Sequence, residues 1–191
     1  MKLFHIHTLY DGPQNVHPQW LTGVLGKEIC PECYSPMQGT GALDIPIEGR
    51  LEDVPLNVAI PIALGLIRLD LLSALGEDEF REYFFVGNVV DSDGKVIEDF
   101  FTFAGKSQLI IRGGPNSSHR KCGSCGRQLY HPIGKRYVLK SSLDGRPFYE
   151  SQLNQIIAGE DAASRVMGEA WDFLKITPLS VLDKAQDDRD D

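Results

Sequence analysis

The sequence contains no long hydrophobic run. Within its 191 residues the most apolar stretch, 54–75, is broken by two prolines, an asparagine and the charged residues Arg68 and Asp70. A helix needs about 20 consecutive apolar residues to cross a bilayer, so we expect this stretch to be buried core and expect no membrane partner. The N-terminal residues alternate in polarity and lack the apolar run and small-residue cleavage site of a secretory signal. These features predict a cytoplasmic protein.

Positive charge is also scarce. The chain has 19 Lys plus Arg against 27 Asp plus Glu, a formal net charge of −8. A surface of this sign argues against duplex DNA or an anionic membrane as the main partner. The hydrophobic fraction of 42% and charged fraction of 24% are those of an ordinary globular protein. The length predicts a single domain over residues 1–186, followed by an acidic frayed tail at 187–191.

Motifs of catalysis are missing as well. The sequence has no GxSxG, no HExxH, no GxxxxGK[ST] and no GxGxxG after a predicted strand. Glu150, or Asp91 with Asp93, could act as acid and base, but unpaired surface carboxylates are common in any acidic protein. We therefore predict that the chain is not an enzyme.

Cysteines are few, but all four fall into two tight pairs, Cys30-Pro-Glu-Cys33 and Cys122-Gly-Ser-Cys125-Gly. A two-residue spacing lets one turn aim both sulfurs at a common point about 2.3 Å from each, and two such turns complete a tetrahedral shell. We predict one zinc ion held by Cys30, Cys33, Cys122 and Cys125. Because four thiolates leave no open coordination position, this zinc is expected to be structural.

Other interpretations of the cysteines remain open at this point. The pairs could be redox dithiols, disulfides or iron–sulfur ligands, and His119 or His131 could replace a cysteine as ligand. Zinc is favoured because both pairs lie in turn-like sequence and four thiols already fill a shell. Positions 34–121 separate the pairs, far more than the spacing of about 15 to 20 in a simple ribbon. The metal would therefore tie an N-terminal segment to a C-terminal one across an insert at 35–120.

The hydrophobic patterns predict an α+β fold, an antiparallel sheet with packed helices and a zinc-ribbon-like site formed by two distant CxxC turns. Strands 83–90 and 96–103 flank an Asp-Ser-Asp-Gly turn, and with 109–112 they predict an antiparallel meander. The other predicted elements are strands at 2–9 and 137–140, helices at 61–75, 148–157 and 160–171, and extended segments at 43–47 and 176–181.

Charge is unevenly distributed along the chain. The segment from Arg112 to Arg146 carries eight basic residues and one acid, Asp144. A zinc turn among Arg and Lys, with Tyr130 and Tyr137 interleaved, is typical of a nucleic-acid-binding ribbon. The alternative is that these cations pair with the protein's own carboxylates. We favour that alternative because the acidic remainder of the chain opposes phosphate.

The two cysteine turns resemble those of the double-CXXCG family of bacterial proteins. The resemblance rests on Ile29–Cys33, which follows a tryptophan-containing lead-in, and on Cys122–Arg127. The tail is also similar, with a helical stretch ending near Phe173 and a closing extended segment at 176–179. In outline the resemblance covers nearly the whole chain. Tyr34 departs from the pattern, because the family has glycine there, which permits a left-handed backbone.

The resemblance implies an immunity function, since the family includes a protein that neutralises a toxin delivered between sibling cells. We therefore expect a non-enzymatic protein that binds a cognate protein toxin. Many toxins that attack nucleic acid are basic, and an acidic partner associates with them quickly through electrostatic steering. The predicted contact face comprises Glu77, Asp78, Glu79, Glu82, Glu98 and Asp99. The alternative function is a zinc-ribbon regulatory protein that binds nucleic acid through the Arg112 to Arg146 segment.

Overall fold

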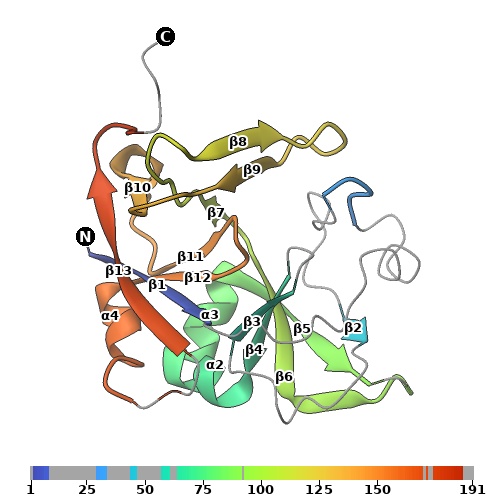
Figure 1. Ribbon diagram of the computed structural model, residues 1–191. Helices are drawn as coiled ribbons and strands as arrows, with labels where there is room; N and C mark the ends of the chain where they lie inside the picture. Colours follow the sequence, from blue (N-terminus) through green and yellow to red (C-terminus); the bar gives the residue numbers. More distant parts are fainter. Residues whose placement is uncertain are drawn as a thin grey trace.

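The computed structural model describes residues 2–8, 29–33, 44–46, 57–60, 64–91, 93–169, 171 and 174–186. This part of the chain is mostly sheet with few, short helices (Figure 1). It forms a six-stranded sheet, a five-stranded sheet and a separate two-stranded ribbon. The predicted acidic tail and Tyr34 lie outside the described residues. Among the described helices none combines the length and apolarity needed to span a bilayer.

The six-stranded sheet nearly closes into a cylinder. Its strand order is β10-β13-β1-β12-β11-β7. At its ends, Arg112 just beyond β7 and Tyr137 in β10 exchange backbone N–H to C=O hydrogen bonds of 2.7 and 3.0 Å. The strands are β1 (Leu3–Thr8), β7 (Gln108–Leu109), β10 (Tyr137–Leu139), β11 (Phe148–Ser151), β12 (Ile156–Gly159) and β13 (Leu174–Leu182).

The five-stranded sheet contains the predicted hairpin. Its strand order is β2-β5-β6-β4-β3, and the Asp91 carboxylate accepts the backbone N–H groups of Asp93 and Lys95 at the turn between β5 and β6. This short-range hydrogen bonding is why the Asp-Ser-Asp-Gly tract forms a turn. The strands are β2 (Ile45–Pro46), β3 (Asn57–Ile60), β4 (Leu64–Arg68), β5 (Phe84–Val90) and β6 (Val96–Gly105).

Helices α2 (Leu69–Leu75), α3 (Glu77–Tyr83) and α4 (Glu160–Ser164) pack into a core shared by the two sheets, and a 3-10 turn, η3, covers Lys140–Ser142. The rings of Phe80, Phe84, Phe103 and Phe148 meet in this core in stacked and edge-to-face contacts. A second cluster, including Leu3, Tyr149 and Ile157, belongs to the six-stranded sheet. Apolar residues of strands and helices thus form two adjoining cores.

Two predicted helices contain strands instead. Residues 64–68 form β4, and a helix begins only at Leu69; residues 61–63 lie outside the described part. Residues 148–157 form β11, a turn and β12, with the Ser151 hydroxyl accepting the N–H groups of Leu153 and Gln155. Strands β11 and β12 are buried at every position. A short segment buried on both faces lacks the period of two that identifies a half-buried strand, so its sequence does not distinguish it from a buried helix.

Two further predictions need correction. The predicted third strand of the meander, 109–112, overlaps β7 only at Leu109. Strand β7 pairs in parallel with β11 of the other sheet, whereas β6 pairs with β4. The predicted helix at 160–171 ends at Ser164. Strands β1, β5, β6, β10 and β13 confirm the other strand predictions, and β2 lies within the extended segment predicted at 43–47.

Candidate metal centre

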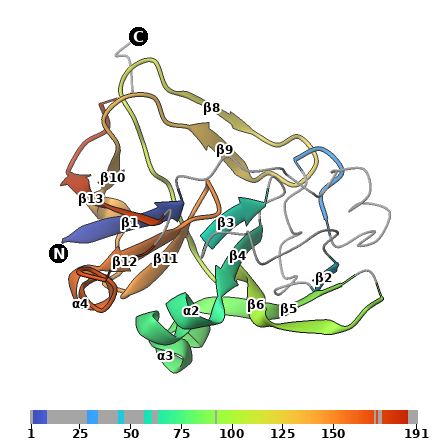
Figure 2. The same cartoon turned by 60° about the horizontal axis from the view of Figure 1, so that its bottom comes forward.

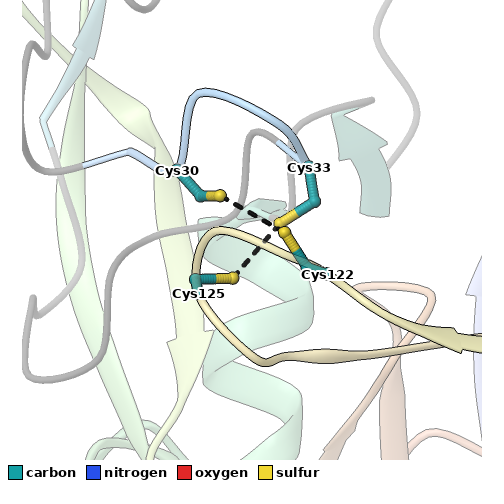
Figure 3. A group of neighbouring side chains, drawn as sticks. All are labelled: Cys30, Cys33, Cys122 and Cys125. Atoms are coloured by element: carbon teal, nitrogen blue, oxygen red, sulfur yellow. Dashed lines mark hydrogen bonds between the residues drawn. The ribbon is translucent and has the colours of Figure 1, made fainter.

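The four cysteine side chains converge on one point, as Figure 3 shows. Their sulfur atoms all lie within 4.8 Å of one another, and Cys30 to Cys122 and Cys33 to Cys125 are each separated by 3.5 Å. Around a metal with sulfur bonds of about 2.3 Å, tetrahedral sulfurs would be about 3.8 Å apart. A disulfide would require about 2.05 Å, so these thiols are free. The cluster could therefore bind a metal ion.

A two-stranded ribbon positions the second pair of cysteines. Strands β8 (Ser118–Lys121) and β9 (Gln128–His131) are antiparallel, and Cys122 and Cys125 lie in the turn that joins them. The Cys122 N–H donates to the Arg127 carbonyl and the Gly126 N–H to the Cys122 carbonyl, both at 2.9 Å. Gly126 has φ +73°, a left-handed conformation that favours glycine. The CGSCG sequence thus forms the turn that aims both sulfurs inward.

The first pair comes from the segment 29–33, which lies beside the ribbon turn in Figure 1. Ile29 and Cys30 are buried there. Among the described contacts of this segment, the Glu32 carboxylate accepts hydrogen bonds from Arg120 and Ser124 of the ribbon. The two cysteine pairs thus come from segments that are distant in sequence, as the long-range tie predicted from the sequence requires.

Backbone N–H groups point at the sulfurs. Burial raises the pKa of Cys30, but N–H groups of Cys33 and Glu32 and neighbouring thiols outweigh it, so the net pKa is lowered. Burial raises the pKa of Cys122 and of Cys125, against the opposing N–H groups of residues Ser124 to Arg127. The thiolate is the form that binds metal, so loading this centre would release protons. The N–H groups offer hydrogen bonds to the resulting anionic sulfurs.

The histidines considered as ligands do not join the cluster. His119 is exposed and stacks on Tyr130 with ring centroids 5.9 Å apart, and His131 is exposed on β9. Among the described residues, the only group able to hold a metal through three or more His, Cys, Asp or Glu atoms is the four cysteines. These are the same four cysteines that the sequence proposed as metal ligands.

The predicted acidic face is divided between two elements. Glu77, Asp78, Glu79 and Glu82 belong to α3, and Glu98 and Asp99 to β6. Arg81 links the two elements, since its guanidinium lies 5.7 Å from the ring centroid of Phe101 in β6. The register of β6 against β5 shifts between Val96 and Phe101, and Glu98 and Asp99 both lie exposed in this stretch. The two acids of β6 therefore lie in the irregular part of the strand, close to the residue that contacts α3.

Internal ion pairs engage part of this acidic set. Glu77 pairs with Arg81 at 2.8 Å and Glu79 with Arg165 at 2.6 Å. The exposed carboxylates of Asp78, Glu82, Glu98 and Asp99 make no ion pair with any described residue. Four of the six therefore remain available to a partner.

The basic segment is largely engaged within the protein. Four of its eight cations form ion pairs, Arg120 with Glu32, Arg127 with Glu150, Lys140 with Asp183 and Arg146 with Asp144, at 3.3, 3.9, 3.6 and 2.6 Å. Arg112 lies over the Tyr130 ring, 5.7 Å from its centroid. Within the described part of the chain, Lys121, Lys135 and Arg136 make no ion pair. The sequence-based preference for internal pairing thus holds for half of the segment.

Glu150, which the sequence offered as an acid or base, is buried in β11. Burial raises its pKa to about 7, although Arg127 and the Gly105 N–H act in the opposite direction. One carboxylate oxygen has no hydrogen-bond partner. This environment differs from the exposed surface position that the sequence suggested.

Sequence reasoning missed two polar residues that organise these regions. Glu32, between the first two cysteines, contacts the second cysteine turn. Arg165 donates to the Leu75 carbonyl at 2.6 Å as well as pairing with Glu79, so it fixes the junction of α2 and α3. No local pattern identifies either contact, because each joins residues about 90 positions apart.

No protein-family model matches the chain, and no curated protein matches it.

Proposed function

We propose that Cys30, Cys33, Cys122 and Cys125 bind a structural zinc ion in a zinc-ribbon-like site. Four converging sulfurs support this assignment, because zinc readily accepts a tetrahedral shell of thiolates and imposes no other geometry. A closed shell has no position for water or substrate, so the ion would brace the fold without acting as a Lewis acid. Its role would be to hold the segment 29–33 against the ribbon.

We further propose that the protein is an immunity protein that acts in the cytoplasm. In this proposal it binds and neutralises a cognate protein toxin without catalysing a reaction. The resemblance of the cysteine turns suggested this function, and the distribution of unpaired charge supports it.

The observation that carries the proposal is the charge left over after internal pairing. Asp78 and Glu82 are exposed on α3 and Asp99 is exposed on β6, and none of the three forms an ion pair with a described residue. In Figure 2, α3 and β6 lie at the end of the molecule opposite to the ribbon β8–β9. Exposed acidic side chains that form no internal ion pair can attract a basic partner through long-range steering.

The test pairs the protein with a candidate toxin encoded by a neighbouring gene. We expect coexpression to restore growth of toxin-producing cells and the two purified proteins to form a complex. Asp78→Lys, Glu82→Lys and Asp99→Lys, measured singly, should each slow association and flatten its dependence on salt. Asp183→Lys is the matched control, since it changes net charge equally in an exposed pair with Lys140. Failure to restore growth would reject the function, and equal association rates in all four variants would reject the face.

A nucleic-acid-binding regulator is the second candidate, supported by the exposure of the ribbon. All four residues of β8 are exposed, including Arg120 and Lys121, and a projecting ribbon can follow a phosphate backbone. Retention on heparin at low salt distinguishes the candidates. Weak retention favours the immunity protein, because half of the cations of the basic segment form internal ion pairs. Strong retention that Lys121→Glu abolishes would favour the regulator.

A further inference from the structure

The side chain of Glu32 joins the two cysteine turns. It belongs to the first turn, yet its carboxylate accepts hydrogen bonds from the Ser124 N–H at 3.0 Å and the Ser124 hydroxyl at 3.2 Å. Arg120, at the end of the ribbon, donates to its other oxygen at 3.3 Å. One carboxylate of the first turn is thus bound by three donors of the ribbon.

The fit between the turns is close at Gly123. A Cβ atom at this position would lie 3.2 Å from a Glu32 oxygen, which is tighter than an ordinary van der Waals contact. The Ser124 N–H and hydroxyl both donate to this same oxygen, Oε2. Glu32 therefore lies against the backbone of the CGSC turn.

These contacts do not involve a metal ion. They join the same two turns that the four sulfurs would join, and they orient the CGSC backbone relative to Cys30 and Cys33. Outer residues that orient metal ligands commonly change metal affinity by about 10–100-fold when they are replaced. The carboxylate also adds negative charge beside four thiolates, and Arg120 opposes that charge.

We propose that Glu32 is a positioning residue for the metal centre, which holds the two cysteine turns together so that their four sulfurs already converge when the ion binds. This inference rests on the proposed zinc site. Glu32 would thus do more than separate Cys30 from Cys33, because its side chain would hold the first cysteine turn against the second.

The experiment measures zinc affinity of the full chain by competition with a chromogenic chelator, and the absorption spectrum of the cobalt-loaded protein. For Glu32→Ala we expect zinc affinity to fall by about 10-fold or more, with a cobalt spectrum altered from that of tetrahedral sulfur coordination. Glu32→Gln should recover most of the affinity, because the amide oxygen can still accept the Ser124 N–H. Glu98→Ala, an exposed carboxylate on β6, is the control and should bind like the wild type.

Thermal unfolding of each metal-free variant separates positioning from general stability. We expect the metal-free Glu32→Ala and Glu98→Ala proteins to unfold at similar temperatures although their zinc affinities differ. Equal zinc affinity of Glu32→Ala and the wild type would overturn the inference, and so would tighter binding, which would mean that repulsion outweighs positioning. If the wild-type protein bound no zinc, the proposed zinc site itself would be wrong. If Glu32→Ala bound zinc as the wild type does, only the positioning role of Glu32 would be wrong.

Discussion

The carboxylate of Glu150 lies 3.9 Å from the guanidinium of Arg127, so a buried acid of the six-stranded sheet meets the residue that follows the second cysteine turn. The Glu150 side chain is 5% exposed and that of Arg127 20%. At this separation the ion pair is long, and one Glu150 oxygen has no hydrogen-bond partner. The ion pair and hydrogen bonds of this carboxylate therefore do not fully offset the free-energy cost of removing it from water.

This environment predicts that Glu150 makes the protein less stable as pH rises. Burial raises the pKa of Glu150 from 4.5 to about 7 in the folded protein. The contribution of Glu150 to the free energy of unfolding is therefore fully present below pH 4.5 and is lost as the pH rises to about 7. Glu150→Gln mimics the protonated acid and should remove this loss, which is at most about 1.4 kcal/mol per pH unit. Urea unfolding at pH 5 and pH 8 measures the difference, with the exposed Glu160→Gln as control. Parallel pH profiles for wild type and Glu150→Gln would contradict the assignment.

His5 should have the opposite effect. Burial, with smaller contributions from His7 and Arg136, lowers its pKa from 6.5 to about 3. Below pH 6.5, His5 binds a proton in the unfolded chain but stays neutral in the folded protein. The free energy of unfolding therefore falls as the pH decreases from 6.5 towards 3. In His5→Asn this part of the pH dependence should disappear, even if the substitution lowers the free energy of unfolding at neutral pH. The slope of unfolding free energy between pH 4 and pH 6 is the measurement, and exposed His131→Asn should keep the wild-type slope.

The cysteine cluster could be predicted from sequence because its information is local. A CxxC turn fixes the direction of both thiols by itself, and four thiols in two turns leave few ways to complete a shell. The hairpin of β5 and β6 was equally accessible, since the Asp91 side chain forms the turn through residues next to it. Each cysteine turn and this hairpin turn depend on contacts within about five positions of the chain.

Features that depend on distant partners could not be predicted. Residues 64–68 form a strand because β6 and β3 pair with them on both sides. The apolar sequence of this segment does not indicate which strands will pair with it. The same applies to β7, which pairs with β11 about 40 residues away. Glu32 looked like a spacer between two cysteines until the ribbon was brought against it. Tertiary pairing decided these cases against local pattern.

Metal removal should loosen one part of the protein and leave the rest folded. Neither the core shared by the two sheets nor the smaller cluster around Tyr149 contains a cysteine. We expect chelation to increase hydrogen exchange in 29–33 and in the ribbon, 118–131, while β1, β11 and β12 stay protected. Cys30→Ser should produce the same exchange pattern and lower zinc content below one ion per chain. Uniform loss of protection would instead show that the ion supports the whole fold.

The close approach of Gly65 and Phe103 predicts a strongly destabilising substitution in the shared core. Gly65 in β4 pairs with Phe103 in β6, and a Cβ atom on Gly65 would overlap the Phe103 ring, which is fully buried. Gly65→Ala must therefore displace a ring that also contacts Phe80 and Phe84. Overpacking of this kind costs about 1–3 kcal/mol.

Gly114→Ala is the matched control, because its added Cβ would meet only the Ile133 carbonyl at an ordinary 3.6 Å. Chemical denaturation of both variants gives the comparison. We expect the free energy of unfolding of Gly65→Ala to fall. That of Gly114→Ala should stay within about 0.5 kcal/mol of the wild type. If Gly65→Ala were as stable as the control, the packing of β4 against β6 would have to differ from that described here, because a buried ring in a close-packed core has no free volume into which it can move.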